Sequence, residues 1–228
     1  MLVLRSLIGV ALQLAAFAAG LFLPAGTWHW PRAVQFLLVY GIVVSGAVFV
    51  LARTAPKGLE ARLALPAAES QPVADRIATS LILLSTIAWW VFIPIDVFRL
   101  HLLPPTSPSV SALGAAISLA GLGIILMTIH QNAFVAPIVK DQSDRGQTLV
   151  DTGLYGRIRH PMYLGFILWL AGLALWLEST AGAIAVSALL PAFLLRIRIE
   201  EHSPEKMLRT SNSARNTAGS SEPSQRYS

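Results

Sequence analysis

The sequence contains no cysteine among its 228 residues. This absence excludes disulfide bonds, thiolate metal sites and cysteine nucleophiles, and it leaves the redox compartment undefined. Charged residues are also scarce, at 13% of the chain, whereas soluble domains usually carry about 25%. Hydrophobic residues make up 54% of the chain. So apolar a chain has too little polar surface to cover itself in water, and we expect much of its exterior to face lipid.

The motifs that bind common cofactors through phosphates or metals are also missing. The sequence has no Walker loop, no glycine-rich dinucleotide fingerprint and no cluster of metal ligands. Its five histidines are scattered along the chain. The net charge is +5, but the basic residues are not gathered in one aromatic-laced patch. We therefore expect neither a metal nor a nucleic-acid partner.

Six apolar runs alternate with polar connections, and a membrane-spanning helix needs roughly 20 mostly apolar residues. The runs cover residues 2–23, 33–51, 77–98, 110–129, 162–177 and 181–195. The last two are short, so we expect them to form a tight hairpin. Small residues in the fourth run suit close packing against another helix: Gly114, Ser118, Gly121 and Gly123. We predict an all-α fold, a polytopic transmembrane bundle of about six membrane helices with a cofactor pocket on the cytosolic side.

The distribution of Lys and Arg predicts the orientation of this bundle. Most of them lie after the second run, after the fourth run and at the end of the last one: Arg53, Lys57, Arg62, Arg76, Lys140, Arg145, Arg157, Arg159, Arg196 and Arg198. The other three connections hold only Arg32 and Arg99. The positive-inside rule therefore places the basic connections and both termini in the cytosol, and we expect a bacterial inner membrane.

The chain divides into four segments. Residues 1–51 are predicted to hold the first two helices, of which residues 1–23 also resemble a cleaved signal peptide but are long for one. Residues 52–76 form a cytosolic connection, and residues 77–201 form a membrane core with a polar loop at 131–161. The tail, residues 202–228, has few large apolar residues and is predicted to be disordered, because it cannot bury enough surface to offset its ordering entropy.

A first group of polar, aromatic and glycine residues occupies residues 147–165, directly before the fifth apolar run and in its first residues. Pro161 suits the first turn of a helix, which puts Arg159 and His160 at a helix N-terminus. The N–H groups there favour an anionic group such as a carboxylate or a phosphate. The alternative, that His160 is a simple interfacial residue, remains open.

A second group closes the last apolar run and consists of Arg196, Arg198, Glu200 and Glu201. Arg196 and Glu200 are four residues apart, so they share one face of a helix. The alternative here is that Arg196 and Arg198 only anchor the helix at the lipid headgroups, and that the glutamates are solvated.

Together the two groups resemble motifs of the isoprenylcysteine carboxyl methyltransferase family and of the related phospholipid methyltransferases. The segment 151–165, centred on Arg159-His160-Pro161-Met162-Tyr163, is similar to the family's Gly-x-Tyr…Arg-His-Pro-x-Tyr-x-Gly signature. The family's Arg-x-x-x-Glu-Glu motif matches residues 196–201. The pair Asp75-Arg76, with Asn132 and Phe134, also looks like bacterial members. The resemblance covers about residues 52–201.

The resemblance implies S-adenosyl-L-methionine as the cofactor. The residues whose positions match the family's cofactor contacts are Gln147, Thr148, Leu149, Val150, Tyr155, His160, Pro161, Met162, Tyr163, Glu200 and Glu201. Lys140 is a looser match to a further contact. The resemblance also implies catalytic roles for Arg196, beside the reacting end of the substrate, and for Glu200. The acceptor would be lipophilic, of carboxylate, amine or phenol type, and would enter from among the membrane lipids.

Two other functions remain open alongside a methyltransferase. Membrane sterol-type reductases that use NADPH have a similar Arg-His-Pro-x-Tyr segment, but Met162 and Phe166 stand where they usually carry Asn and an acidic residue. The third possibility is a non-catalytic, degenerate relative. After Glu201 the family continues with an apolar, aromatic helix, whereas Ser203-Pro204 interrupts any helix here. We therefore expect weak or absent turnover unless the membrane part binds the cofactor without that helix, and tight binding of S-adenosylmethionine in a calorimetric titration would contradict weak turnover.

Overall fold

The computed structural model describes residues 1–63, 73–131 and 158–201. Their elements are α1 (Leu2–Ala25), α2 (Pro31–Thr54), α3 (Pro56–Leu63), α4 (Val73–Ile95), the π-helix η2 (Asp96–Leu100), α5 (Pro108–Gln131), α6 (Pro161–Trp176), α7 (Thr180–Ala185), the 3-10 helix η4 (Val186–Leu189) and α8 (Leu190–Glu201). Five helical stretches are long and apolar enough to cross a membrane, and α6 is a shorter apolar helix. The predicted polytopic helical bundle is confirmed. The predicted tail at 202–228 lies outside the described residues.

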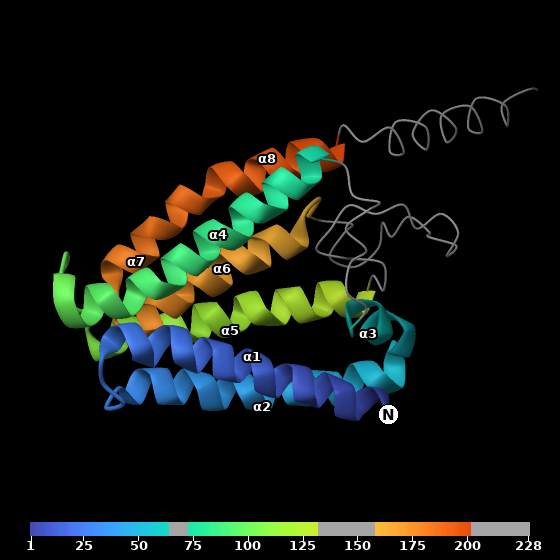
Figure 1. The fold of residues 1–228 in the computed structure, drawn as a ribbon, viewed down its shortest axis with the longest axis horizontal. Coiled ribbons are helices and arrows are strands. Elements are labelled where there is room, and N and C mark those ends of the chain that lie inside the picture. The colour runs from blue at the N-terminus through green and yellow to red at the C-terminus, as the bar shows by residue number, and fades with distance from the viewer. Residues whose placement is uncertain (64–72, 132–157, 202–228) are drawn as a thin grey trace, which may run out of the picture.

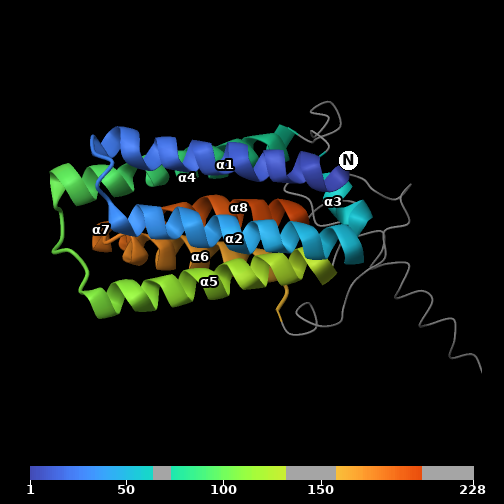
Figure 2. The same ribbon diagram turned by 90° about the horizontal axis from the view of Figure 1, so that it is seen from below.

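The helices run side by side along the long axis of the molecule (Figures 1 and 2). Helix α1 packs against both α2 and α4, α8 runs beside α4 (Figure 1), and α5 and α6 pack on each other with α5 at the edge of the bundle (Figure 2). At one end α2 finishes and α4 and α6 begin, and this end carries Arg53, Arg76, Arg159 and Arg198. We call it the basic end. The opposite end holds the three turns that join α1 to α2, η2 to α5, and α6 to α7.

The boundaries of the helices follow from local backbone chemistry. Helix α1 ends at Gly26, whose φ of 71° is the left-handed conformation that glycine adopts without strain, and whose N–H donates to the Phe22 carbonyl at 3.0 Å. Helices α2 and α6 begin at Pro31 and Pro161. Proline suits this first position because its fixed φ is already helical and its missing N–H has no partner there.

Helices α5 and α6 are packed with their backbones in contact. A Cβ atom at Gly121 would lie 2.4 Å from the backbone nitrogen of Trp169 and 2.7 Å from the carbonyl oxygen of Gly165. A Cβ atom at Gly172 would lie 2.4 Å from the backbone nitrogen of Ser118. Side chains larger than hydrogen at either glycine would therefore push the two helices apart. Such contacts are the usual basis of helix association in lipid.

The expectation that Gly123 shares this interface is wrong. A Cβ atom at Gly123 would meet no other atom within 4 Å, because two positions along a helix rotate a residue by about 200° from Gly121. Gly114, Ser118 and Gly121 do face α6.

A buried carboxylate joins α4 to the α6–α7 hairpin at the opposite end. The third apolar run was predicted to continue as one helix to residue 98, but the α-helix stops at Ile95 and η2 follows. The Asp96 side chain, 3% exposed, accepts hydrogen bonds from the Ser179 hydroxyl at 2.6 Å and the Leu102 N–H at 3.1 Å. The Ser179 hydroxyl oxygen also accepts from the Gly182 N–H at 2.8 Å, capping α7. These bonds hold the predicted tight hairpin against the end of α4.

Gly121→Ala is predicted to destabilise the bundle by about 1–3 kcal/mol, because the new methyl group meets backbone atoms that cannot move independently. The matched control is Gly123→Ala, which should leave stability unchanged or raise it slightly through helix propensity. Thermal unfolding of both variants in detergent measures the difference. Equal melting temperatures would show that the α5–α6 contact is looser than described.

Candidate functional site

The start of α6 is held against α8 by aromatic contacts at the basic end. His160 occupies the N-cap position of α6 and Pro161, fully buried, the first position of the helix. The Tyr163 ring, 8% exposed, lies 5.9 Å from the His160 ring and 5.8 Å from the Phe193 ring of α8. Tyr163 therefore links the predicted signature segment to the last helix.

Arg196, on α8, is buried against α4. Its side chain is 4% exposed, and its Nη1 donates a hydrogen bond to the Thr79 hydroxyl. Its Nη2 lies 3.5 Å from Oδ1 of Asp75, a carboxylate that is fully buried. The Thr79 hydroxyl in turn donates to the Asp75 carbonyl oxygen at 2.7 Å. Burying either side chain without a partner of opposite charge would cost several kcal/mol, so the two are buried as a pair.

The two predicted groups of polar residues thus meet at one end of the bundle. Phe193 contacts α6, and Arg196, almost one turn further along α8, contacts α4. Glu200 and Glu201 follow in the last turn of α8, which ends beside the start of α4 (Figure 1). Of the predicted cofactor-binding residues, His160, Pro161, Met162 and Tyr163 lie in or directly before the first turn of α6.

The remaining predicted residues are less fully described. Gln147, Thr148, Leu149, Val150, Tyr155 and the looser match Lys140 lie outside the described residues. For Glu200 and Glu201 the structure describes the helical backbone only. The cofactor-binding set is therefore brought together in part, and the roles assigned to its members stay predictions.

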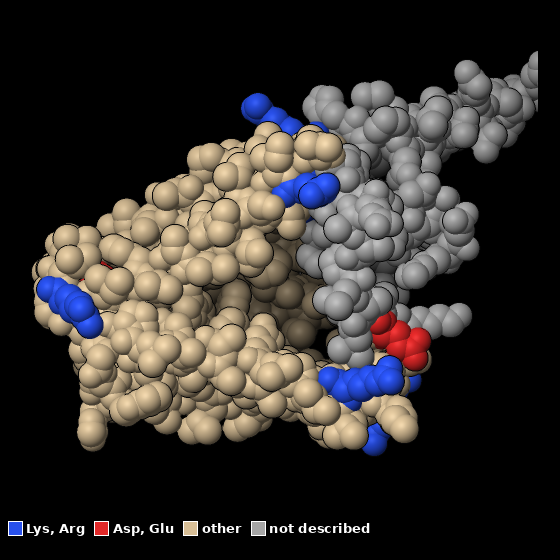
Figure 3. Space-filling model, viewed as in Figure 1, with Lys and Arg blue, Asp and Glu red and all other residues tan. Residues whose placement is uncertain are grey.

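The basic end also differs from the rest of the surface in charge and shape. In the view of Figure 3, most of the basic side chains that are drawn lie toward this end, and the surface is hollowed between α1 and α4. Arg53, Arg76 and Arg159 are exposed there. In the described part of the chain, no group of three His, Cys, Asp or Glu side chains is arranged to hold a metal ion. The arrangement suits an anionic or polar ligand instead.

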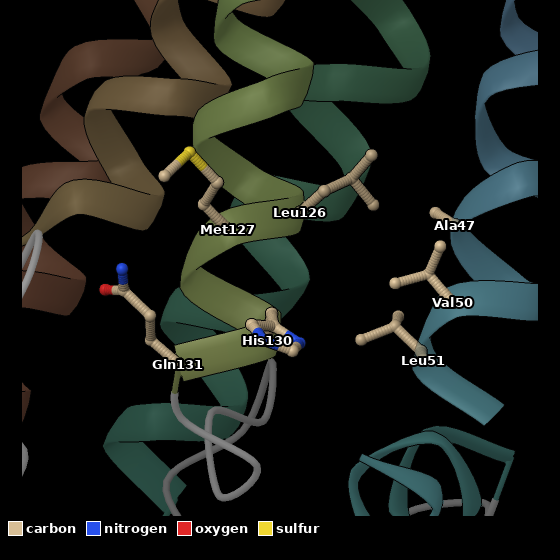
Figure 4. Close-up of a pocket in the computed structure, with 7 residues that line it drawn as sticks. All are labelled: Ala47, Val50, Leu51, Leu126, Met127, His130 and Gln131. Carbon is tan, nitrogen blue, oxygen red and sulfur yellow. The ribbon is translucent and has the colours of Figure 1, made fainter. Parts of the chain in front are cut away.

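An apolar groove of about 290 Å³ opens between α2 and α5 near the basic end (Figure 4). Its lining residues are Ala47, Val50, Leu51, Leu126, Met127, His130 and Gln131. The two helices contact each other only slightly, and the Thr54 hydroxyl lies 3.3 Å from Nδ1 of His130 at the mouth of the groove. We name this feature the α2–α5 groove. Its walls are hydrocarbon and its polar groups are confined to one end.

Sequence reasoning did not assign roles to Thr79 or Phe193. Asp75 entered only as part of the pair Asp75-Arg76 that looks like bacterial members. A signal was present, because Asp75 and Thr79 are four residues apart at the start of an apolar helix and so share a face. An acidic residue inside a membrane helix also requires a partner, and the basic residues near the basic end were the candidates.

Comparisons with known proteins extend these observations. The family described as phospholipid methyltransferase matches residues 110–210 of this chain. A protein-S-isoprenylcysteine O-methyltransferase from Saccharomyces cerevisiae is 42% identical over 65 residues, which are 28% of this chain and 27% of that protein. The matched stretch thus spans about a quarter of the relative's length. No solved structure matches the chain. The resemblance to this family is confirmed, and the family match continues past Glu201 to residue 210.

Phe193→Ala is predicted to lower the stability of the bundle by roughly 3–5 kcal/mol, because it removes the ring that joins α8 to Tyr163. Leu194→Ala is the matched control: this residue is 57% exposed, so we expect a much smaller change. Denaturation followed by circular dichroism in the same detergent compares them. If Phe193→Ala unfolds like the control, the Tyr163–Phe193 contact does not join the helices.

Proposed function

We propose that this chain, which matches the phospholipid methyltransferase family over residues 110–210, is an S-adenosylmethionine-dependent membrane methyltransferase with a lipophilic acceptor. The observation that carries the proposal is the meeting of the α6 start with α8 at the basic end, through Tyr163 and Phe193. This meeting brings the Arg-His-Pro segment and the Arg-to-Glu-Glu segment to one site. If the two motifs lay on separate faces of the bundle, they could not bind one cofactor together.

The residues at this end fit the polar parts of the proposed cofactor. The N–H groups in the first turn of α6, which begins at Pro161 after the N-cap residue His160, suit its amino-acid carboxylate. The carboxylates of Glu200 and Glu201 suit its ammonium group and ribose hydroxyls as acceptors. When bound, S-adenosylmethionine supplies an electrophilic methyl group on a sulfonium.

The role of the protein is then mainly to place the acceptor in line with that methyl group and to exclude water. Tyr163 and Phe193 provide an apolar wall that excludes water, and Arg196 provides a positive charge beside it. A carboxylate acceptor would need no general base, whereas an amine or a phenol would first have to lose a proton.

We propose the α2–α5 groove as the place where the hydrocarbon chain of the acceptor lies. Val50 and Met127 line the groove and are exposed on the outside of the bundle, and its polar mouth, with Thr54 and His130, is on the same end as the candidate site. A chain moving from lipid into this groove gains little hydrophobic free energy, because lipid tails are equally apolar. The groove would therefore orient the acceptor rather than concentrate it.

The proposed orientation places the basic end in the cytosol, in accordance with the positive-inside rule. The polar methyl donor then arrives from water, and the acceptor arrives sideways from the inner leaflet. A site at this boundary is accessible to both.

Calorimetric titration of the purified protein tests the cofactor. Against the weak turnover expected from the interruption after Glu201, we expect S-adenosylmethionine to bind and NADPH not to bind, because the family match continues past Glu201 to residue 210. Glu200→Ala should weaken binding by roughly 10- to 100-fold, the equivalent of one hydrogen bond to a charged group. Glu60→Ala is the control, an exposed glutamate of α3 on the same end. Binding of NADPH alone would instead support a reductase, and binding of neither would support a non-catalytic protein.

Transfer of labelled methyl groups to a total lipid extract tests the acceptor, and the labelled product identifies it. Ala47→Trp should fill the α2–α5 groove and reduce transfer by about tenfold or more through misplacement of the acceptor, without changing cofactor affinity. Ile42→Trp, on the bilayer-facing side of the same helix, serves as the control because residue 42 is 72% exposed. Equal transfer by the two variants would rule out the groove.

A further inference from the structure

We infer that Asp75 and Thr79 of α4 are positioning residues, which fix the orientation of the Arg196 guanidinium for methyl transfer. This inference rests on the proposed function. Its basis is the buried contact between α4 and α8, which lies outside the predicted set of site residues except for Arg196 itself.

The Thr79 hydroxyl is itself held in one orientation. A threonine in a helix has two accessible side-chain rotamers, and the bond from the Thr79 hydroxyl to the Asp75 carbonyl, at 2.7 Å, selects one of them. The hydroxyl proton is used in this bond. The oxygen lone pairs are therefore available to accept the N–H of Arg196 from a defined direction.

Two contacts from one helix determine the plane of the guanidinium. Nη1 is bound by Thr79 and Nη2 lies 3.5 Å from the Asp75 carboxylate. Because the group is rigid and planar with five N–H donors, fixing two of its nitrogens also fixes the directions of the others. The position of Asp75 and Thr79 on α4 thus sets where Arg196 can donate.

Stability alone is a weak reason for this arrangement. Replacing a buried ion pair by apolar residues of similar size is often neutral or stabilising, because the desolvation cost of the charges disappears. The pair is placed between Phe193, which contacts the α6 start, and Glu200, one turn beyond Arg196. An oriented positive charge at this position serves the substrate end of the site.

The test compares single-turnover transfer of labelled methyl groups to the lipid extract in matched variants. Thr79→Val keeps the shape of the side chain but removes the acceptor, and Thr79→Ser keeps the acceptor. We expect Thr79→Val to slow transfer by up to about 100-fold, the effect of a small misplacement at a reacting centre, and Thr79→Ser to restore it. S-adenosylmethionine affinity, measured by calorimetry, should be unchanged in both.

Variants that remove one or both charges of the Asp75–Arg196 pair distinguish a role in positioning Arg196 from a purely structural role. Asp75→Asn alone leaves the Arg196 charge buried without its counter-ion, so it should lower both the melting temperature and the transfer rate. The double variant Asp75→Asn with Arg196→Gln removes both charges, and we expect it to recover the melting temperature but not the transfer rate.

Recovery of both quantities by the double variant, or wild-type transfer by Thr79→Val, would overturn the inference while leaving the proposed function intact. Failure of the wild-type protein to transfer any label would overturn the proposed function and this inference together.

Discussion

The backbone contact between α5 and α6 is the constraint on which the other arrangements depend. In lipid, helices gain no hydrophobic attraction for one another, so close approach of backbones is a main source of association. The glycines at 121, 165 and 172 permit that approach and place these faces of α5 and α6 against each other. In this orientation of α6, Tyr163 faces α8 and contacts Phe193.

Different kinds of polar contact hold the helices together at the two ends of the bundle. At the opposite end, Asp96 accepts bonds from backbone and hydroxyl donors, and these bonds tie α4 to the α6–α7 hairpin. At the basic end the link between α4 and α8 is an ion pair, Asp75 with Arg196. A buried charge is costly wherever the bilayer excludes water. The presence of this ion pair therefore points to a functional role rather than to a contribution to stability.

The sequence predicted the helices well because the length of an apolar run and the position of proline are local properties, as Pro31 and Pro161 illustrate. It failed at Gly123, since composition does not reveal which face of a helix meets its neighbour. Thr79 was missed for a similar reason: its role exists only because α8 folds back across α4. The α2–α5 groove arises from the loose contact of two helices distant in the chain, which no local pattern encodes.

The shortness of α6 has a consequence for the depth at which chemistry would occur. Its 16 residues extend about 24 Å, whereas the hydrocarbon core of a bilayer is about 30 Å thick. Its far end is tied to η2 by the Ser179–Asp96 bond. With that end level with the outer headgroups, as in the proposed orientation, the missing length falls at Pro161. The methyl donor and the acceptor would then meet several ångströms below the lipid headgroups. The water-soluble donor would have to enter the leaflet to that depth to reach the lipophilic acceptor.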